Sequence, residues 1–146
     1  MVDTPIALRD AIIEDATVIA TLLGELGYPS QPEGVRGRLA RLLAREGSRV
    51  FVAERGGRVV GVLGLDRMPV LTSLSDIAMI IALVVTEHER RSGVGRLLVA
   101  RAEDEARAWQ CGRIMVTSAE RRADAHSFYQ RLGYEYTGRR FAKGIL

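Results

Sequence analysis

The sequence predicts a mixed α/β (α+β) fold, in which a mainly antiparallel central sheet of six to seven strands is flanked by about four helices. Three observations lead to this fold class. Gly56-Gly57 separates two β-rich runs and is typical of a tight hairpin. Residues 77–85 form a continuous apolar run, as in a strand covered on both faces. Strand and helix patterns alternate elsewhere, and the length predicts one domain over residues 1–146.

The first half of the chain contains two amphipathic helices and three strands. A short strand over 6–9 precedes a helix that starts near Glu14 and ends at Gly27, and a second helix ends at Gly47. The strands on either side of the glycine pair cover 50–54 and 58–66. The apolar positions recur with helical spacing, at Ala16, Ile19, Leu23 and Leu26 in the first helix and at Val35, Leu39, Leu42 and Leu43 in the second.

The second half begins with a loop over 68–75 and the apolar strand over 77–85. The longest helix follows from Val94, because Leu98, Ala102 and Ala106 recur every four residues. A short strand over 113–117, a helix that ends at Gly133 and a last strand over about 134–142 complete the prediction. The sheet should therefore combine an antiparallel hairpin with a later strand–helix–strand unit.

Composition restricts the classes of function. The formal net charge is +3 and the sequence pI is about 9.5, and 20 of the 21 basic residues are arginine. Arginine binds phosphate and carboxylate groups through its planar fork, which favours an anionic small ligand. An aromatic content of 5% leaves few rings to stack on bases, which argues against a nucleic-acid partner. Cys111 is the only cysteine, so no disulfide and no metal site are expected.

The longest apolar run is too short for a membrane span, so no membrane partner is expected. The first ten residues contain acidic residues and proline where a secretory signal would have a basic start and an apolar run. These features predict a cytoplasmic protein. A homodimer is the default expectation for a small protein of this kind.

The candidate binding residues lie between Leu83 and Arg96, where the apolar strand passes through a turn into the longest helix. The first amides of a helix lack internal acceptors and lie at the positive end of the helix dipole, so they can hold a diphosphate. Gly93 and Gly95 allow phosphate oxygens to approach these amides, and neighbouring arginines could add charged contacts. The same string also fits a glycine-containing loop without a ligand. Position 98 is Leu and no Gly-Lys-Ser/Thr occurs, so neither a dinucleotide fingerprint nor a P-loop is present.

Arg90, Gly93 and Gly95 form an Arg-x-x-Gly-x-Gly string after the apolar strand, and the stretch from Ala125 to Tyr134 reads Ala-x-x-Phe-Tyr-x-x-x-Gly-Tyr. These strings resemble two signatures of the GNAT superfamily of N-acetyltransferases. The first is its Arg/Gln-x-x-Gly-x-Gly/Ala loop after a central strand, and the second is its Ala-x-x-Phe-Tyr-x-x-x-Gly-Phe/Tyr helix end. The family often has glycine at the position of Arg91 and asparagine near Ser118. The resemblance covers the whole chain and implies a GNAT-like sheet with a splayed pair of strands at the cofactor site.

The resemblance implies transfer of an acetyl group from acetyl-CoA to a primary amine of a small molecule or peptide by direct attack. It assigns Tyr129 as the general acid that protonates the leaving thiolate, and a strand amide near Val85 as the donor to the oxyanion. His126 is a weaker relay candidate. The residues implied to bind coenzyme A are Leu83, Val84, Val85, Arg90, Arg91, Ser92, Gly93, Val94, Gly95, Arg96 and Ser118.

The sequence leaves the general base unassigned. The acidic candidates are Asp76, Glu87, Glu89 and Glu120, each near an element end where a solvated carboxylate is common. For this reason a non-catalytic acetyl-CoA or coenzyme A binding regulatory module is the alternative function. The acceptor is equally open, because polyamine-like molecules, antibiotics, amino acids and protein amino termini all fit the resemblance.

Overall fold

The structure is a computed structural model that describes residues 4–117 and 123–146. The chain forms two compact units, Met1–Met115 and Val116–Leu146, and each is described by itself. The elements of the first unit are β1 (Ile6–Asp10), η1 (Ile13–Asp15), α1 (Ala16–Leu26), α2 (Pro32–Ala44), β2 (Ser48–Arg55), β3 (Arg58–Met68), β4 (Ile77–Val85), η2 (Glu87–Glu89) and α3 (Val94–Ala108). Strand β5 (Arg113–Val116) crosses the boundary, and α4 (Ala123–Arg131) lies in the second unit.

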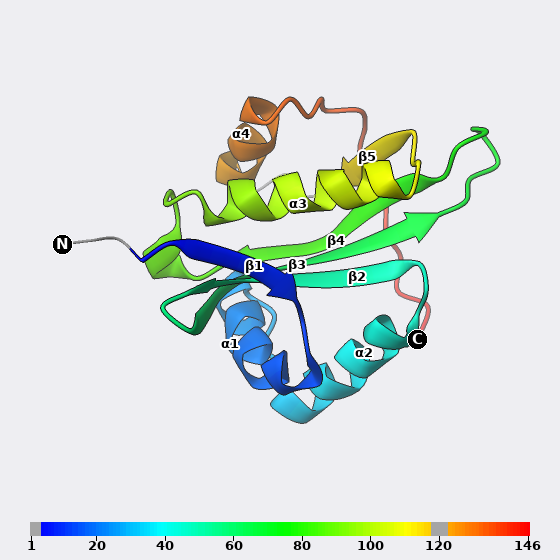
Figure 1. Cartoon of the computed structure of the whole chain (residues 1–146). Coiled ribbons are helices and arrows are strands. Elements are labelled where there is room, and N and C mark those ends of the chain that lie inside the picture. The colour runs from blue at the N-terminus through cyan, green and yellow to red at the C-terminus, as the bar shows by residue number, and fades with distance from the viewer. Residues whose placement is uncertain (1–3, 118–122) are drawn as a thin grey trace. The chain divides into compact units, whose positions relative to one another are not determined.

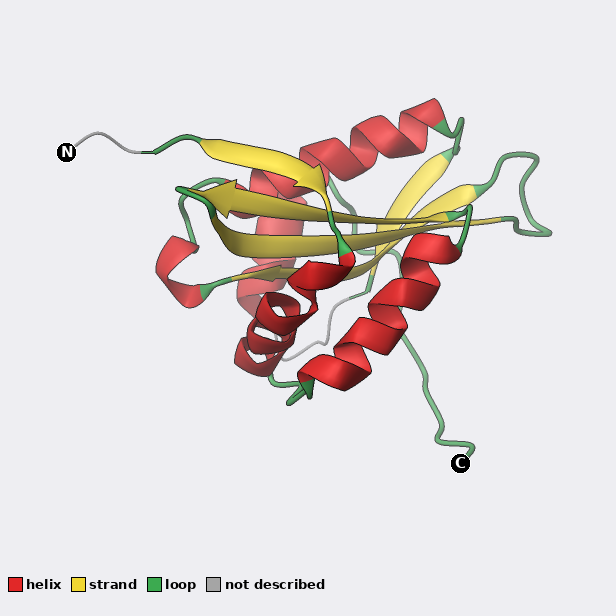
Figure 2. Ribbon diagram, turned by 60° about the horizontal axis from the view of Figure 1, so that its bottom comes forward, coloured by secondary structure: helices red, strands yellow, loops and turns green. Residues whose placement is uncertain are grey.

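Five strands form one sheet in the order β1-β2-β3-β4-β5. The pairs β1–β2, β2–β3 and β3–β4 are antiparallel. Helix α3 covers one face, and α1 and α2 cover the other (Figure 1). The strands twist along the sheet, as Figure 2 shows. This is the mixed α/β architecture that the sequence predicts, with helices on both sides of a mainly antiparallel sheet.

Strand β2 has apolar side chains on both of its faces, and each face is covered by helices. Val50 and Val52 belong to a buried cluster with residues of α1 and α2, while the intervening Phe51 lies on the side of α3, with the guanidinium of Arg101 over its ring. Inward-facing residues therefore alternate along the strand, as the period of a β-strand requires. The other members of the cluster are Ala11, Ala16, Ile19, Ala20, Leu22, Val35, Leu39, Val62 and Val84.

The hairpin prediction is confirmed. Gly56 and Gly57 have φ values of 59° and 77°, so both central residues of the β2–β3 turn are left-handed. This is the conformation of the two-residue turns whose twist matches that of the flanking strands. Helix α1 ends, as predicted, at a left-handed Gly27. Helix α2 ends at Ala44, earlier than the predicted limit at Gly47.

Strand β4 contains a β-bulge. Gly64 pairs with Ala82 and Leu65 with Ile80, so Ile81 is an extra residue on β4. Ile81 is 45% exposed, although the apolar run predicted a strand covered on both faces. The extra residue interrupts the alternation of side chains between the two faces of β4, and this leaves Ile81 partly exposed.

The predicted last strand over 134–142 is wrong. Residues 132–146 continue from α4 without a strand (Figure 2), and the described sheet has five strands instead of six to seven. The tyrosines and phenylalanine of this segment favour a strand only where a partner strand supplies hydrogen bonds and packing. Gly138, at a φ of 156°, further weakens the local preference for a strand.

The predicted splay of two strands concerns β4 and β5. The Gly112 amide donates to the Asp76 carbonyl at 2.9 Å, so β5 starts beside the start of β4. Strand β5 has four residues and β4 has nine, so β4 continues past the described end of β5. Separation of the chain beyond that end stays a prediction. No helix in residues 4–117 and 123–146 is long and apolar enough to span a membrane.

Candidate active site

The predicted phosphate turn lies where β4 passes into α3. Strand β4 ends at Val85, and α3 begins at Val94 after the short helix η2. Val85 pairs with Gly61 on β3. A Cβ atom built on Gly61 would lie 2.9 Å from Cγ1 of Val94. The absence of a side chain at Gly61 therefore allows the start of α3 to pack directly over the end of β4.

The first turn of α3 has the geometry of an anion site. Its first intrahelical hydrogen bond runs from the Leu97 amide to the Gly93 carbonyl at 3.1 Å. The amides of Val94, Gly95 and Arg96 precede that bond, and helix geometry gives such amides no acceptor within the helix. Gly93 is the N-cap residue at a φ of 93°, and it has no side chain to occupy the space in front of these amides. A diphosphate could accept hydrogen bonds there at the positive end of the helix dipole.

Arg91 adopts a backbone conformation that is uncommon for residues other than glycine. Its φ is 67°, in the left-handed region. The turn therefore contains two left-handed residues, Arg91 and Gly93, just before α3. Successive amides in such turns form concave anion sites. Arg90, Arg91 and Arg96 are exposed, so their guanidinium groups can turn toward an anion at the helix start.

One ion pair and two hydrogen bonds hold the turn. The Glu89 carboxylate pairs with Arg55 of β2, with Nε 2.9 Å from Oε1. Ser92 donates its hydroxyl to the Glu89 carbonyl. Arg90 Nε lies 3.4 Å from the Val85 carbonyl oxygen. Ser92 and Glu89 thus stabilise the turn itself, and Arg55 joins it to the sheet.

The predicted coenzyme-binding residues differ in how far their side chains are exposed. The side chains of Val84 and Val94 are buried in the core, at 2% and 0% exposure, so only their backbone atoms can reach a ligand. Leu83 and Val85 are half-buried on β4. Ser118 lies outside the described residues. The predicted site residues on β4, the turn and α3 are continuous in the structure, as the sequence indicates.

The sequence profile of the acetyltransferase (GNAT) family matches residues 13–134. This chain belongs to the GNAT family. An aminoalkylphosphonate N-acetyltransferase from Salmonella typhimurium is 33% identical over 143 residues, which cover 94% of this chain and 90% of that relative.

Solved structures show that the GNAT fold extends over almost the whole chain. A transcriptional regulator from Bacillus halodurans superposes with a TM-score of 0.89 at 23% identity, covering 97% of this chain and 100% of that one. An aminoglycoside 6'-N-acetyltransferase from Acinetobacter haemolyticus gives a TM-score of 0.81 at 21% identity, covering 95% and 99%. Both similarities show the fold.

In this GNAT chain, Tyr129 is positioned within the second unit by the end of α4. The Gly133 amide donates to the Gln130 carbonyl, and the Tyr134 amide donates to the Tyr129 carbonyl, both at 3.0 Å. Together with Gly133 at a φ of 92°, these bonds form a Schellman motif. The Tyr129 ring lies 5.8 Å from the Tyr134 ring and 5.2 Å from the Phe128 ring. The two neighbouring rings therefore restrict the orientation of the Tyr129 ring.

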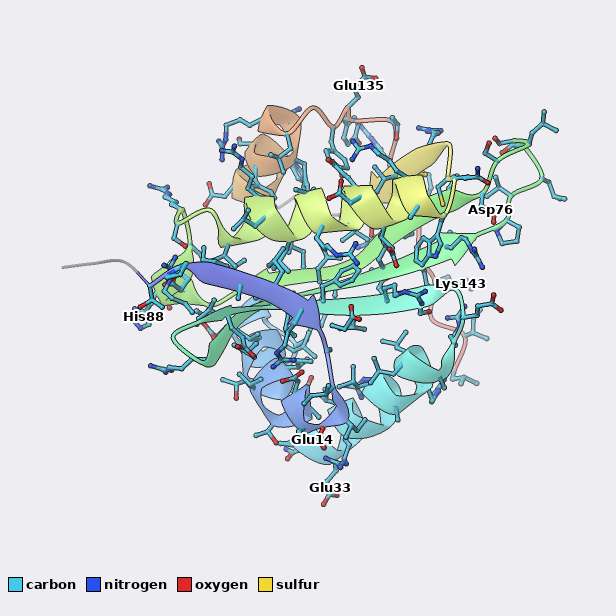
Figure 3. The ribbon with its side chains drawn as sticks, viewed as in Figure 1. Glu14, Glu33, Asp76, His88, Glu135 and Lys143 are labelled. Carbon is cyan, nitrogen blue, oxygen red and sulfur yellow. The ribbon has the colours of Figure 1, made fainter. Side chains whose placement is uncertain are left out.

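The structure gives the acidic candidates for the base different surroundings. Asp76 lies 3.9 Å from Arg67, and Glu89 pairs with Arg55, so both carboxylates have a cationic neighbour. Figure 3 shows Asp76 at the opposite end of the sheet from His88, which lies on the turn after β4. Glu87 is exposed on that turn, and Glu120 lies outside the described residues.

Cys111 has the properties of a packing residue. Burial raises the pKa of its thiol, and the charge of Asp76 raises it further, while Arg67 acts in the opposite direction. A raised pKa keeps the thiol protonated near neutral pH. Cys111 is therefore a poor candidate for a nucleophile.

Sequence reasoning missed Gly61 and Glu25. Gly61 stands on β3 beneath the start of α3. Glu25, on α1, accepts hydrogen bonds from the turn after β4. Neither residue lies within a recognisable motif, since each acts on a segment far away in the sequence. Only the tertiary structure brings them to the phosphate turn.

Proposed function

We propose that this chain is an acetyl-CoA-dependent N-acetyltransferase that acts on a primary amine. The observation that carries the proposal is the start of α3, which follows the turn after β4. Gly93 has no side chain there, so the first helix amides are accessible. Exposed arginines surround this point, and the diphosphate of coenzyme A has the charge and the acceptor oxygens that such a turn binds. Membership of the GNAT family supports the same assignment.

Acetyl-CoA supplies an activated thioester carbonyl. The half-buried Leu83 and Val85 border the last part of β4, which extends beyond β5 and so offers backbone amides to a ligand. A strand amide near Val85 would donate a hydrogen bond to the carbonyl oxygen as negative charge develops there. Such fixed donors act mainly on the transition state.

Tyr129 would complete the transfer as the general acid. The amine nitrogen forms its bond to the acetyl carbon, the carbon–sulfur bond breaks, and the Tyr129 hydroxyl gives its proton to the departing sulfur. The second proton that the nitrogen loses as it becomes an amide restores the Tyr129 hydroxyl. A free alkylamine has a pKa of about 10.4, so the amine must lose a proton before it attacks. Water or an exposed carboxylate such as Glu87 would receive that proton.

The acceptor that we propose is a small primary amine with an anionic group. The Salmonella relative is named for aminoalkylphosphonates, which combine an amine with a phosphonate. The net charge of +3 and the 20 arginines of this chain would attract an anionic acceptor. A non-catalytic coenzyme A binding module is the second candidate, because the Asp76 and Glu89 carboxylates both have arginine neighbours that compete with a role as base.

Release of free coenzyme A thiol distinguishes the acetyltransferase from the non-catalytic binding module. We expect free coenzyme A to form when the chain is incubated with acetyl-CoA and 2-aminoethylphosphonate, and more slowly with propylamine, which lacks the anion. Calorimetry with coenzyme A provides the binding arm. Binding without thiol release from any amine of a broad panel would favour the regulatory module, and absence of binding would exclude both candidates.

A further inference from the structure

The carboxylate of Glu25 contacts the turn after β4. Glu25 lies near the end of α1, and its Oε2 accepts a hydrogen bond from the Thr86 hydroxyl at 3.1 Å. Its Oε1 accepts a second bond from the Glu87 amide at 3.0 Å. These contacts connect residues 61 and 62 positions apart. They join helix α1, on one face of the sheet, to the turn that leads into α3.

The contacted residues are those at which β4 becomes the turn. Thr86 directly follows the strand, and its amide donates to the Val60 carbonyl of β3 at 2.8 Å. Glu87 is the first residue of η2, so its amide has no acceptor within that short helix. Glu25 supplies this acceptor from a different helix. The start of the turn is therefore held between β3 and α1.

We propose that Glu25 is a positioning residue for the phosphate turn. Its two hydrogen bonds fix where the chain leaves β4, and therefore where Arg90, Arg91 and Gly93 stand in front of α3. The inference rests on the proposed coenzyme site and assigns to α1 a part in forming it. Glu25 touches neither the reacting atoms nor the diphosphate in this role, since it acts through Thr86 and Glu87.

Substitution of Glu25 changes the affinity for coenzyme A in opposite directions for a positioning role and for a simple effect of charge. A carboxylate near a diphosphate repels it, so a role through charge alone predicts tighter binding when Glu25 is neutralised. A positioning role predicts weaker binding when the hydrogen bonds are lost. Glu25→Gln removes the charge but keeps an amide oxygen for the Glu87 amide and an NH₂ group that can donate to the Thr86 oxygen.

The test is calorimetric titration of coenzyme A into the wild-type chain and four variants. We expect Glu25→Ala to raise the dissociation constant about fivefold, which corresponds to about 1 kcal/mol. Glu25→Gln should stay within about twofold of wild type, and Thr86→Val, which loses one bond, should rise about threefold. Glu33→Ala is the matched control, since it removes an exposed carboxylate that points away from the sheet on α2 (Figure 3).

The double variant Glu25→Ala with Thr86→Val completes the design. Because the two residues share one hydrogen bond, we expect the double variant to bind only as weakly as Glu25→Ala alone. Unchanged or tighter binding by Glu25→Ala, with normal binding by wild type, would overturn the positioning role alone. Absence of binding by wild type would instead overturn the proposed function, and this inference with it.

Discussion

Gly61 of β3 lies directly beneath Val94, the first residue of α3. A Cβ atom on Gly61 would lie 2.9 Å from Cγ1 of Val94, 3.0 Å from Cδ1 of Leu98 and 3.3 Å from the Val84 carbonyl oxygen. Val94 and Leu98 are both fully buried, so neither side chain has free space to move into. The small volume of Gly61 thus sets how closely α3, which begins at the proposed phosphate site, approaches the end of β4.

Gly61→Ala should therefore affect both stability and ligand binding. The added methyl group overpacks the contact, and we expect a loss of about 1–3 kcal/mol in the free energy of unfolding. Displacement of the first turn of α3 should also weaken binding of coenzyme A. Urea unfolding and calorimetry measure the two effects. Gly37→Ala is the control, because a Cβ there meets no atom within 4 Å and alanine favours the helix. Wild-type behaviour of Gly61→Ala would contradict the packing argument.

Gly93→Ala tests the conformation of the turn. A φ of 93° is unfavourable for alanine, so the substitution strains the turn that precedes the first amides of α3. We expect about 1–2 kcal/mol of destabilisation and about tenfold weaker binding of coenzyme A. Gly57→Ala introduces the same kind of strain, at a φ of 77°, in the β2–β3 hairpin. If Gly57→Ala weakened coenzyme binding as much as Gly93→Ala, general strain rather than the phosphate turn would explain the effect.

Tyr129→Phe removes the hydroxyl of the proposed general acid but keeps the ring that packs on Phe128 and Tyr134. We expect turnover to fall about 100-fold or more, with unchanged affinity for coenzyme A. Steady-state kinetics of thiol release measure this effect. Tyr136→Phe, at a residue that is 63% exposed, is the control. Full turnover by Tyr129→Phe would remove Tyr129 from the mechanism.

The ion pair between the half-buried Arg9 and the buried Asp15 should govern stability in acid. Asp15 is 6% exposed, and Arg9 donates to both of its carboxylate oxygens at 2.8 and 2.9 Å. The hydrogen bonds from Arg9 lower the pKa of Asp15 below its ordinary value, despite the opposing effect of burial. Its contribution to stability is therefore complete above the unfolded pKa of about 3.9 and is lost as pH falls through the lower folded pKa.

Asp15→Asn should lower the free energy of unfolding at pH 7 by about 1.5–3 kcal/mol, the value of hydrogen bonds to a charged group. Below about pH 4 the difference from wild type should shrink, because Asp15 of the unfolded wild-type chain binds a proton there before the folded carboxylate does. Unfolding in urea at pH 7 and at pH 2.5 measures both values. Asp10→Asn, at an exposed neighbouring position, controls for net charge. A constant difference at the two pH values would contradict the assigned pKa shift.

Local patterns were sufficient for most elements and for the turn between β4 and α3. The Gly56-Gly57 pair, the apolar run of β4 and the four-residue spacing in α3 are each properties of a continuous segment. The predicted last strand over 134–142 is wrong, because Tyr134 and Tyr136 have side chains that suit a strand but do not supply a partner strand.

The contacts of Glu25 and Gly61 could be found only from the structure. Glu25 meets Thr86 only because α1 packs on the sheet beside the end of β4, and no short-range signal marks either residue. The bulge at Ile81 is likewise invisible in an uninterrupted apolar run, since it depends on the pairing with Gly64 and Leu65 of β3. Long-range pairing, rather than local preference, determines these features.

The most direct measurement is NMR of the backbone amides of Gly93, Val94, Gly95 and Arg96 during titration with coenzyme A and, separately, with pantetheine. Pantetheine lacks the diphosphate and retains the thiol arm. Our account predicts large shifts of these four amide signals with coenzyme A and little change with pantetheine. Equal shifts with both ligands, or binding of coenzyme A that leaves the four amides unchanged, would contradict it.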